Sequence, residues 1–407
     1  MNRILEGLRV VEGSAFIAAP LGGMTLAQMG ADVIRFDPIG GGLDWNRWPV
    51  TDSGRSLYWV GLNKGKRSIA INLREDEGRE LARALITAPG ENSGIFLTNF
   101  APSGWLAYDK LREDRDDLIM MNILGHSDGS SAVDYTVNCA VGYPYTTGNA
   151  ERDAPVNHVF PGWDAVCGVT ASTGILAAER HRRLTGEGQY ISLALSDVAY
   201  AMVGNFGHIA EAQIKKETRP PYGNDLYGAF GRDFGTRDGR RIMIVAITRR
   251  QWSELVKVVG MEEEAARIAE STGRNLNDEG DRFEARDAIA DVVRPWVESR
   301  SLSDVETAFD GTGVCWGLYQ DFVEMVEGDP RCSPANPMFQ ELDQPGVGHY
   351  LVPGSPLDFG AAPRETVRPA PQLGENTDEV LSTILGLGDG QLGDLHDRGI
   401  VAGPSTN

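Results

Sequence analysis

The sequence predicts an α/β protein with a doubly wound, Rossmann-like larger domain and a smaller α+β domain. Short apolar runs alternate with helical patterns through the first half of the 407-residue chain, the order typical of β-α-β units and a parallel sheet. Near residue 222 this alternation stops, and two short strand patterns are followed by charged helices. We therefore expect residues 1–221 and 327–407 to form the large domain and residues 222–326 to form the small one.

The first β-α-β unit spans residues 8–37. A strand is expected over Leu8–Glu12, a helix over Ala18–Met29 and a second strand over Asp32–Asp37. The turn after the first strand reads Gly13-Ser14-Ala15 and lacks the G-x-G-x-x-G spacing of a dinucleotide site. In a parallel sheet the ligand binds at the carboxyl ends of the strands, so that edge is the expected site.

Further strands and helices are expected along the rest of the chain. In the large domain we expect strands over 69–73, 94–97, 117–122 and 190–195, and helices over 77–85 and 165–183. In the small domain we expect strands over 230–234 and 242–246, and helices over 251–259, 262–270, 281–299 and 303–310. The proline-rich remainder, from Asp329 onward, is expected to lie extended over another surface.

Composition and charge narrow the classes of function. A net charge of −20 argues against a nucleic-acid partner. No apolar run approaches the roughly 20 residues that a membrane span needs, and the four cysteines lack the spacing of a metal site. We expect a cytoplasmic protein with reduced thiols, no bound metal and no membrane partner.

Two charged features stand out within this acidic chain. Lys64, Lys66 and Arg67 precede a predicted strand, and they form either a solvated turn or a phosphate contact. Asp164 stands directly before a long run of small and apolar residues. By pattern alone it is a helix N-cap, whose charge the helix dipole would stabilise.

Seven motifs, in this order and spacing, resemble family III CoA-transferases (CaiB/BaiF type), a family that also contains the alpha-methylacyl-CoA racemases. They are GLRVV at 7–11, GADVIRFD at 30–37, NKGKRSIAIN at 63–72, TNF at 98–100, LTGEGQ at 184–189, DG at 238–239 and PAPQLGENT at 369–377. The resemblance covers nearly the whole chain. It implies an acyl-CoA substrate and an interlocked homodimer.

The resemblance also implies roles for individual residues. Asp164 falls on the catalytic aspartate, an ionised nucleophile that attacks the thioester, with backbone N–H groups near the helix start and a glycine loop as oxyanion donors. No cofactor is implied beyond the CoA that the substrate carries. The expected CoA contacts are Phe16, Ile17, Ala18, Arg35, Arg67, Ile71, Arg74, Asn99 and Phe100, with Lys64 and Lys66 as further phosphate candidates.

Two loops are expected to act on the acyl group. The family's glycine-rich lid falls on Gly223–Gly231 and includes Gly223, Tyr227 and Gly228. It is bulkier than a run of glycines, and we expect it to keep the free acid in the site. Arg47 is expected to meet the free carboxylate of the substrate.

The resemblance indicates a transferase. The racemases carry a histidine base before the aspartate of a His-Asp pair, and here that pair is Val133-Asp134. Within this family, the resemblance implies intramolecular transfer of CoA from C1 to C4 of mesaconate, a step of the 3-hydroxypropionate cycle of carbon fixation. Two alternatives stay open: an intermolecular CoA-transferase that uses another acid, and a non-catalytic acyl-CoA-binding protein of the same fold.

Overall fold

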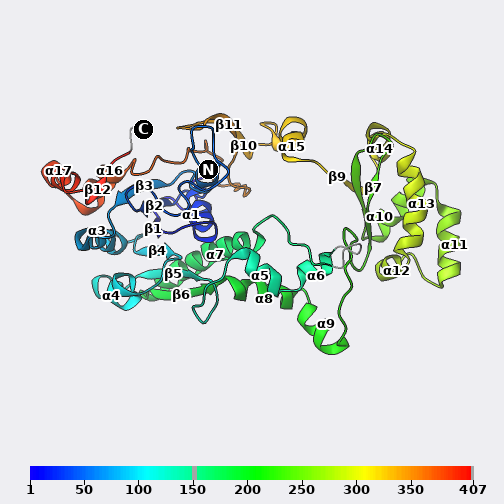
Figure 1. Cartoon of the computed structure of the whole chain (residues 1–407), viewed down its shortest axis with the longest axis horizontal. Coiled ribbons are helices and arrows are strands. Elements are labelled where there is room, and N and C mark those ends of the chain that lie inside the picture. Colours follow the sequence, from blue (N-terminus) through cyan, green and yellow to red (C-terminus); the bar gives the residue numbers. More distant parts are fainter. Residues whose placement is uncertain (149–153, 405–407) are drawn as a thin grey trace. The chain divides into compact units, whose positions relative to one another are not determined.

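The computed structural model describes residues 1–148 and 154–404, in two compact units (Figure 1). The first unit comprises Met1–Val141, Val159–Ile214 and Pro330–Asn407, and the second comprises Gly142–His158 and Lys215–Asp329. The segment 142–158, which the sequence placed with the large domain, belongs to the second unit.

A seven-stranded sheet organises the first unit. Its order is β12-β3-β2-β1-β4-β5-β6, and every pair is parallel except β12 with β3. The strands are β1 (Arg9–Gly13), β2 (Asp32–Asp37), β3 (Arg67–Ile71), β4 (Ile95–Thr98), β5 (Ile119–Leu124), β6 (Gln189–Ala194) and β12 (Val401–Ala402). Apart from the short β12, this is the strand order of a Rossmann fold, so the α/β prediction is confirmed.

Both faces of this sheet are covered by helices, because successive side chains of a strand point to opposite faces. Val11 and Ile34 pack into a core with residues of α3 (Asp76–Thr87), α4 (Tyr108–Asp114) and α16 (Thr377–Leu385). Their neighbours Glu12 and Val33 face Gly23 of α1 (Ala18–Gln28) on the other side. Helix α7 (Gly162–Thr185) packs along α1 and against β5.

Glycines let α1 and α7 approach each other closely. A side chain at Gly168 of α7 would lie 2.6 Å from the carbonyl oxygen of Ala18. Gly22 of α1 in turn faces the carbonyl of Gly168. This contact brings the start of α7 next to the loop that follows β1.

The tail differs from the prediction. It contains the hairpin β10 (Phe339–Gln344) and β11 (Gly348–Pro353), the helices α16 and α17 (Asp389–Asp397), and β12. The prediction that this whole region is extended was therefore wrong. Asn376 and Thr377 bond to the backbone of β3, so the tail completes the edge of the sheet.

Several shorter helices connect the elements of the chain in sequence. They are α2 (Leu57–Leu62), η1 (Gly104–Leu106), α5 (Asp134–Ala140), α6 (Tyr143–Thr147), α8 (Leu195–Asn205), α9 (His208–Lys215), α15 (Phe322–Gly328) and η2 (Pro330–Cys332). Among the described residues, no helix has both the length and the apolar character that crossing a membrane requires.

The second unit has its own sheet and core. The antiparallel strands β7 (Phe230–Gly235), β8 (Arg241–Ala246) and β9 (Cys315–Leu318) pack against helices, with Phe230, Phe234 and Ile244 fully buried. The helices are α10 (Arg249–Val259), α11 (Glu262–Thr272), α12 (Glu279–Glu284), α13 (Arg286–Glu298) and α14 (Leu302–Phe309). The single helix expected over 281–299 is thus divided near Ala285.

Candidate active site

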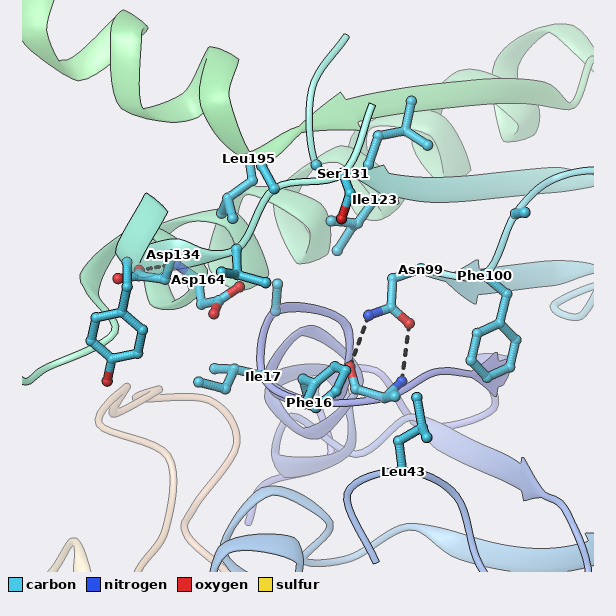
Figure 2. Close-up of a pocket in the computed structure, with 18 of the residues that line it drawn as sticks. Phe16, Ile17, Leu43, Asn99, Phe100, Ile123, Ser131, Asp134, Asp164 and Leu195 are labelled. Atoms are coloured by element: carbon cyan, nitrogen blue, oxygen red, sulfur yellow. Dashed lines mark hydrogen bonds between the residues drawn. The ribbon is translucent and has the colours of Figure 1, made fainter. Parts of the chain in front are cut away.

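A cavity of about 660 Å³ opens at the carboxyl ends of β1, β4 and β5 (Figure 2). It lies where the strand order reverses between β1 and β4, the point at which an open α/β sheet binds its ligand. Its wall includes the predicted Phe16, Ile17, Ala18, Arg47, Asn99, Phe100 and Asp164. The fold therefore brings these seven residues, from four separate segments, to one cavity.

The loop after β1 lines this cavity and is held by hydrogen bonds. The Asn99 side chain accepts a hydrogen bond from Ala15 N–H at 3.0 Å and donates one to the Ala15 carbonyl at 2.8 Å. Phe16 N–H donates to Asp44 Oδ2 at 3.1 Å. Phe16 has a φ of +68°, a left-handed conformation that a bulky residue adopts only when its surroundings impose it.

Asp164 is the third residue of α7 and not its N-cap. The helix begins at Gly162, and its N-cap Pro161 makes no side-chain hydrogen bond. A carboxylate from another helix supplies the cap: Asp134 Oδ2, at the start of α5, accepts from Trp163 N–H at 2.7 Å and Asp164 N–H at 3.0 Å. The predicted capping role of Asp164 was wrong, because the partner lies 30 residues earlier in the chain.

The electrostatic surroundings of Asp164 also differ from the expectation of a plainly ionised carboxylate. Burial, followed by the negative charge of Asp134, raises the pKa of Asp164 to about 7, and the positive charge of Arg47 opposes this shift. The N–H groups of Trp163 and Asp164 are engaged by Asp134, so they are not available as oxyanion donors. A carboxyl that titrates near neutral pH is nevertheless typical of a functional site.

Arg47 and Tyr58 complete the cavity on the side facing Asp164. The Arg47 guanidinium lies 5.1 Å from the centre of the Tyr58 ring and 5.5 Å from that of Phe16. Burial raises the pKa of the Tyr58 hydroxyl, and Asp164 adds to this effect. Tyr58 was missed in the sequence because it stands in a short helix outside the recognised motifs.

Two of the cations expected at the CoA phosphates, Arg35 and Lys66, are buried in ion pairs within the protein core. Arg35 is 1% exposed and binds Asp37 and Asp44, with Nη2 at 3.0 Å from Asp44 Oδ1. Lys66 Nζ lies 2.9 Å from Glu12 Oε1 in the same buried network. Neither is open to a phosphate, so both assignments were wrong. Buried charges of this kind need such partners to offset the loss of hydration.

The remaining candidates divide into buried and exposed residues. Lys64 is buried, and its ammonium group donates to the Gly61 carbonyl. Arg67 forms hydrogen bonds to both carboxylate oxygens of Asp32, and Ile71 is fully buried in the core, so neither points to a ligand. Arg74 is exposed beyond the end of β3 and outside the cavity wall, and its role stays a prediction.

The proposed lid residues belong to the second unit. Gly223 and Gly228 have left-handed φ angles of +60° and +81°, which favour glycine. The Tyr227 ring packs against Arg219, whose guanidinium carbon is 3.6 Å from the ring centre. Their part in closing the site stays a prediction.

Known proteins match this chain along nearly its whole length. The family model described as CoA-transferase family III matches residues 5–377. A 2-methylfumaryl-CoA isomerase from Chloroflexus aurantiacus is 57% identical over 99% of both chains. A succinyl-CoA:mesaconate CoA-transferase from Haloarcula marismortui is 29% identical, over 93% of this chain and 95% of its own. The crystal structure of a CAIB/BAIF family protein from Brucella suis has the same fold, with a TM-score of 0.77 and 24% identity over 94% of this chain and 100% of that one.

Proposed function

The chain belongs to CoA-transferase family III, and on that premise we propose that it converts mesaconyl-C1-CoA (2-methylfumaryl-CoA) to mesaconyl-C4-CoA (3-methylfumaryl-CoA) by intramolecular CoA transfer. The observation that carries this proposal is the likeness, along the full chain, to the 2-methylfumaryl-CoA isomerase. The position of a half-buried aspartate at the switch point of the sheet supports it.

A carboxylate of the protein is needed because CoA cannot pass directly between the two carboxyl groups of mesaconate. Mesaconate is trans across its double bond, so its two carboxyl groups cannot meet in a cyclic anhydride. Asp164 attacks the C1 thioester carbonyl, the C–S bond breaks, and a mixed anhydride and CoA thiolate result. The thiolate then attacks the aspartyl carbonyl, which releases mesaconate and leaves an aspartyl-CoA thioester.

The second half of the reaction reverses these steps at the other carboxyl group. Mesaconate turns within the cavity, and its C4 carboxylate attacks the aspartyl thioester to give a new anhydride and thiolate. The thiolate attacks the C4 carbonyl, which forms mesaconyl-C4-CoA and restores the Asp164 carboxylate. No proton is gained or lost over the cycle.

The walls of the cavity suggest how the intermediates are held. Arg47 is a cation at the Asp164 side of the cavity, so it is suited to bind the free carboxylate of mesaconate as it turns. Ile17 and Ala18, at the start of α1, line the same wall. The first N–H groups of a helix have no partner within the helix, and here they are candidates for the oxyanion donors.

Further properties are proposed with the reaction. The chemistry requires no cofactor besides the CoA that arrives with the substrate. We propose that the protein acts in the cytoplasm, where CoA thioesters are made, as a homodimer like that expected from its family, and within the 3-hydroxypropionate cycle. Light scattering of the purified protein tests the dimer, which predicts twice the mass of the chain.

The activity is tested by incubating the protein with mesaconyl-C1-CoA, without any acceptor acid, and separating the products by chromatography. We expect mesaconyl-C4-CoA to form. Asp164→Ala should abolish turnover and still bind the CoA thioester. If product forms only when another acid is added, the protein is an intermolecular CoA-transferase; if Asp164→Ala retains full turnover, the mechanism is refuted.

Isotope-labelled free mesaconate, added during turnover, tests whether the lid loop Gly223–Gly231 retains the acid. We expect the product to remain unlabelled, because the released acid stays in the site. Extensive labelling of the product would contradict retention, and with it the proposed function of the loop.

A further inference from the structure

Asp134 is a second carboxylate in the wall of the cavity (Figure 2). It is 1% exposed. Its Oδ2 caps α7 through the N–H groups of Trp163 and Asp164. Its other oxygen, Oδ1, is buried without a hydrogen-bond partner among the residues that the structure describes. A buried carboxylate with only one oxygen bonded requires a physical explanation.

The bonded oxygen fixes the backbone of the proposed nucleophile. Because Pro161 provides no cap of its own, the start of α7 is held by α5. The indole Nε1 of Trp163 also donates to Asn138 Oδ1 of α5 at 3.1 Å. The position of Asp164 is therefore set from α5 as well as from its own helix.

Capping alone does not account for the charge of Asp134. Asparagine caps helices about as well as aspartate, and it would place a neutral amide here. Burying a charge with an unbonded oxygen costs free energy that an amide would largely avoid. The negative charge therefore needs a second role, and the carboxyl group of Asp164 is a group in this cavity on which it acts.

We propose, on the basis of the function above, that Asp134 is a positioning residue that holds the backbone of Asp164 and drives its negative charge onto the sulfur of CoA. In the first step an electron pair of Asp164 bonds to the thioester carbon, and the C–S electron pair leaves with the thiolate. Asp164 changes from an anion to a neutral anhydride, so its repulsion with Asp134 disappears. The repulsion acts in the resting site and not in the covalent intermediate.

Among the described residues, four titratable groups interact electrostatically with Asp164, and three of them, Asp134, Arg47 and Tyr58, line the cavity. Asp134 comes from α5, Arg47 from the loop after β2, Tyr58 from α2, and Cys167 from α7 itself. Burial raises the pKa of Cys167 to about 12, and burial also raises that of Tyr58, so both are neutral near pH 7. Asp134 and Arg47 are thus the charges that act on Asp164, and they act in opposite directions.

Asp134→Asn separates the two roles, because it keeps an acceptor for the two N–H groups and removes the charge. The titration of Asp164 is followed by its ¹³Cγ resonance, assigned through its loss in Asp164→Ala. We expect a midpoint near 7 in the unaltered protein and a midpoint lower by about one unit in Asp134→Asn. In the pH profile of kcat/KM, the midpoint of the acid limb should shift to lower pH by the same amount. The pH-independent value of kcat above pH 8, its plateau, should fall several-fold.

A purely structural role predicts a different result, namely a lower plateau with an unmoved acid limb. Asp278→Asn is the matched control, since Asp278 caps α12 through the N–H groups of Gly280 and Asp281, in the second unit. It should change neither the limb nor the plateau. An unchanged Asp164 midpoint in Asp134→Asn, or an unchanged plateau, overturns the proposal.

The titration is measured on the free protein, so it does not depend on the substrate. If the midpoint moves and the unaltered protein leaves mesaconyl-C1-CoA unchanged, the proposed function fails while the effect of Asp134 on Asp164 stands. If the unaltered protein is active and the midpoint stays in place, the proposed function stands and this inference fails.

Discussion

Arg47 is the cation that faces Asp164 in the cavity, and its guanidinium is exposed between two aromatic rings. We predict that Arg47→Ala weakens the binding of mesaconyl-CoA by about 10- to 150-fold, because a hydrogen bond to a charged group contributes about 1.5–3 kcal/mol. The measurement is the Kd in the inactive Asp164→Ala background, by titration calorimetry.

Acetyl-CoA is the matched ligand for this experiment, since it has no second carboxylate. Its affinity should change little when Arg47 is removed. Arg47→Lys should restore part of the loss for mesaconyl-CoA, because lysine keeps the charge without the two-pronged geometry of arginine. An equal loss for both ligands would place Arg47 on the CoA portion instead.

Individual residues show which parts of the site could be predicted from the sequence and which could not. The family resemblance located Asp164 and Phe16, and the motif at 98–100 contains Asn99. Phe16 and Asn99 follow β1 and β4, whose carboxyl ends meet the same edge of the sheet. Arg35 was misassigned, although Asp37 stands two residues later and therefore on the same face of the strand. That spacing was the available signal for an internal ion pair.

The partnership of Asp134 with Asp164 had no such local signal. Helix caps are recognised from residues next to the helix start, and this cap comes from a different helix. Burial was equally hidden, and burial is the first cause of the raised pKa of Asp164. The proposed nucleophile could thus be found from the family resemblance, whereas its protonation behaviour required the three-dimensional structure.

Among the elements, the contact of α1 with α7 determines where Asp164 lies. We predict that Gly168→Ala lowers kcat roughly 10- to 100-fold, because its Cβ would meet the Ala18 carbonyl oxygen and displace the start of α7. The accompanying loss of stability should be about 1–3 kcal/mol. Steady-state kinetics and urea unfolding measure the two effects.

Gly174→Ala is the control on the same helix. Its Cβ would meet only the terminal methyl of Met121, a flexible side chain, and alanine favours a helix by up to about 1 kcal/mol over glycine. It should therefore retain near-normal kcat. Equal losses of activity in the two variants would show that the approach of α1 to α7 does not position the site.

The buried ion pair between β1 and the segment before β3 is predicted to stabilise the fold. Lys66→Met leaves the Glu12 carboxylate buried without its ammonium partner, and should cost about 3–5 kcal/mol in the free energy of unfolding. Adding Glu12→Gln should recover most of that loss. Lys257→Met, at an exposed position of α10, is the control and should be nearly neutral.

Urea unfolding of the four proteins measures this effect. If the double variant is as unstable as Lys66→Met alone, the loss comes from packing of the lysine chain and not from the unpaired carboxylate. The ion pair would then have no specific part in stabilising the fold.

At the scale of the whole molecule, the alternation of strand and helix patterns was sufficient to predict the α/β class. Strand boundaries agreed within about two residues, because buried parallel strands are continuous apolar runs between turn residues. The tail was read from its prolines, which obscured the helices α16 and α17 beyond them. The assignment of 142–158 to the second unit depends on contacts distant in sequence, which no local pattern records.

The central claim is that Asp164 carries the group between the two ends of one acid, and oxygen isotopes test it most directly. Mesaconyl-C1-CoA labelled with ¹⁸O in both oxygens of its free C4 carboxylate is allowed to turn over without an acceptor. The C4 carboxylate attacks the aspartyl thioester through one of its oxygens, and that oxygen remains on Asp164 when the thiolate takes C4.

Mass spectrometry of the peptide that contains Asp164 is the decisive measurement. The mechanism predicts that ¹⁸O is incorporated into the Asp164 carboxyl group, located by fragmentation, with one atom after a single turnover and up to two after many turnovers, as mesaconyl-C4-CoA accumulates. Formation of mesaconyl-C4-CoA with no ¹⁸O in Asp164 would contradict the account, because CoA would then have moved without a covalent bond to that residue.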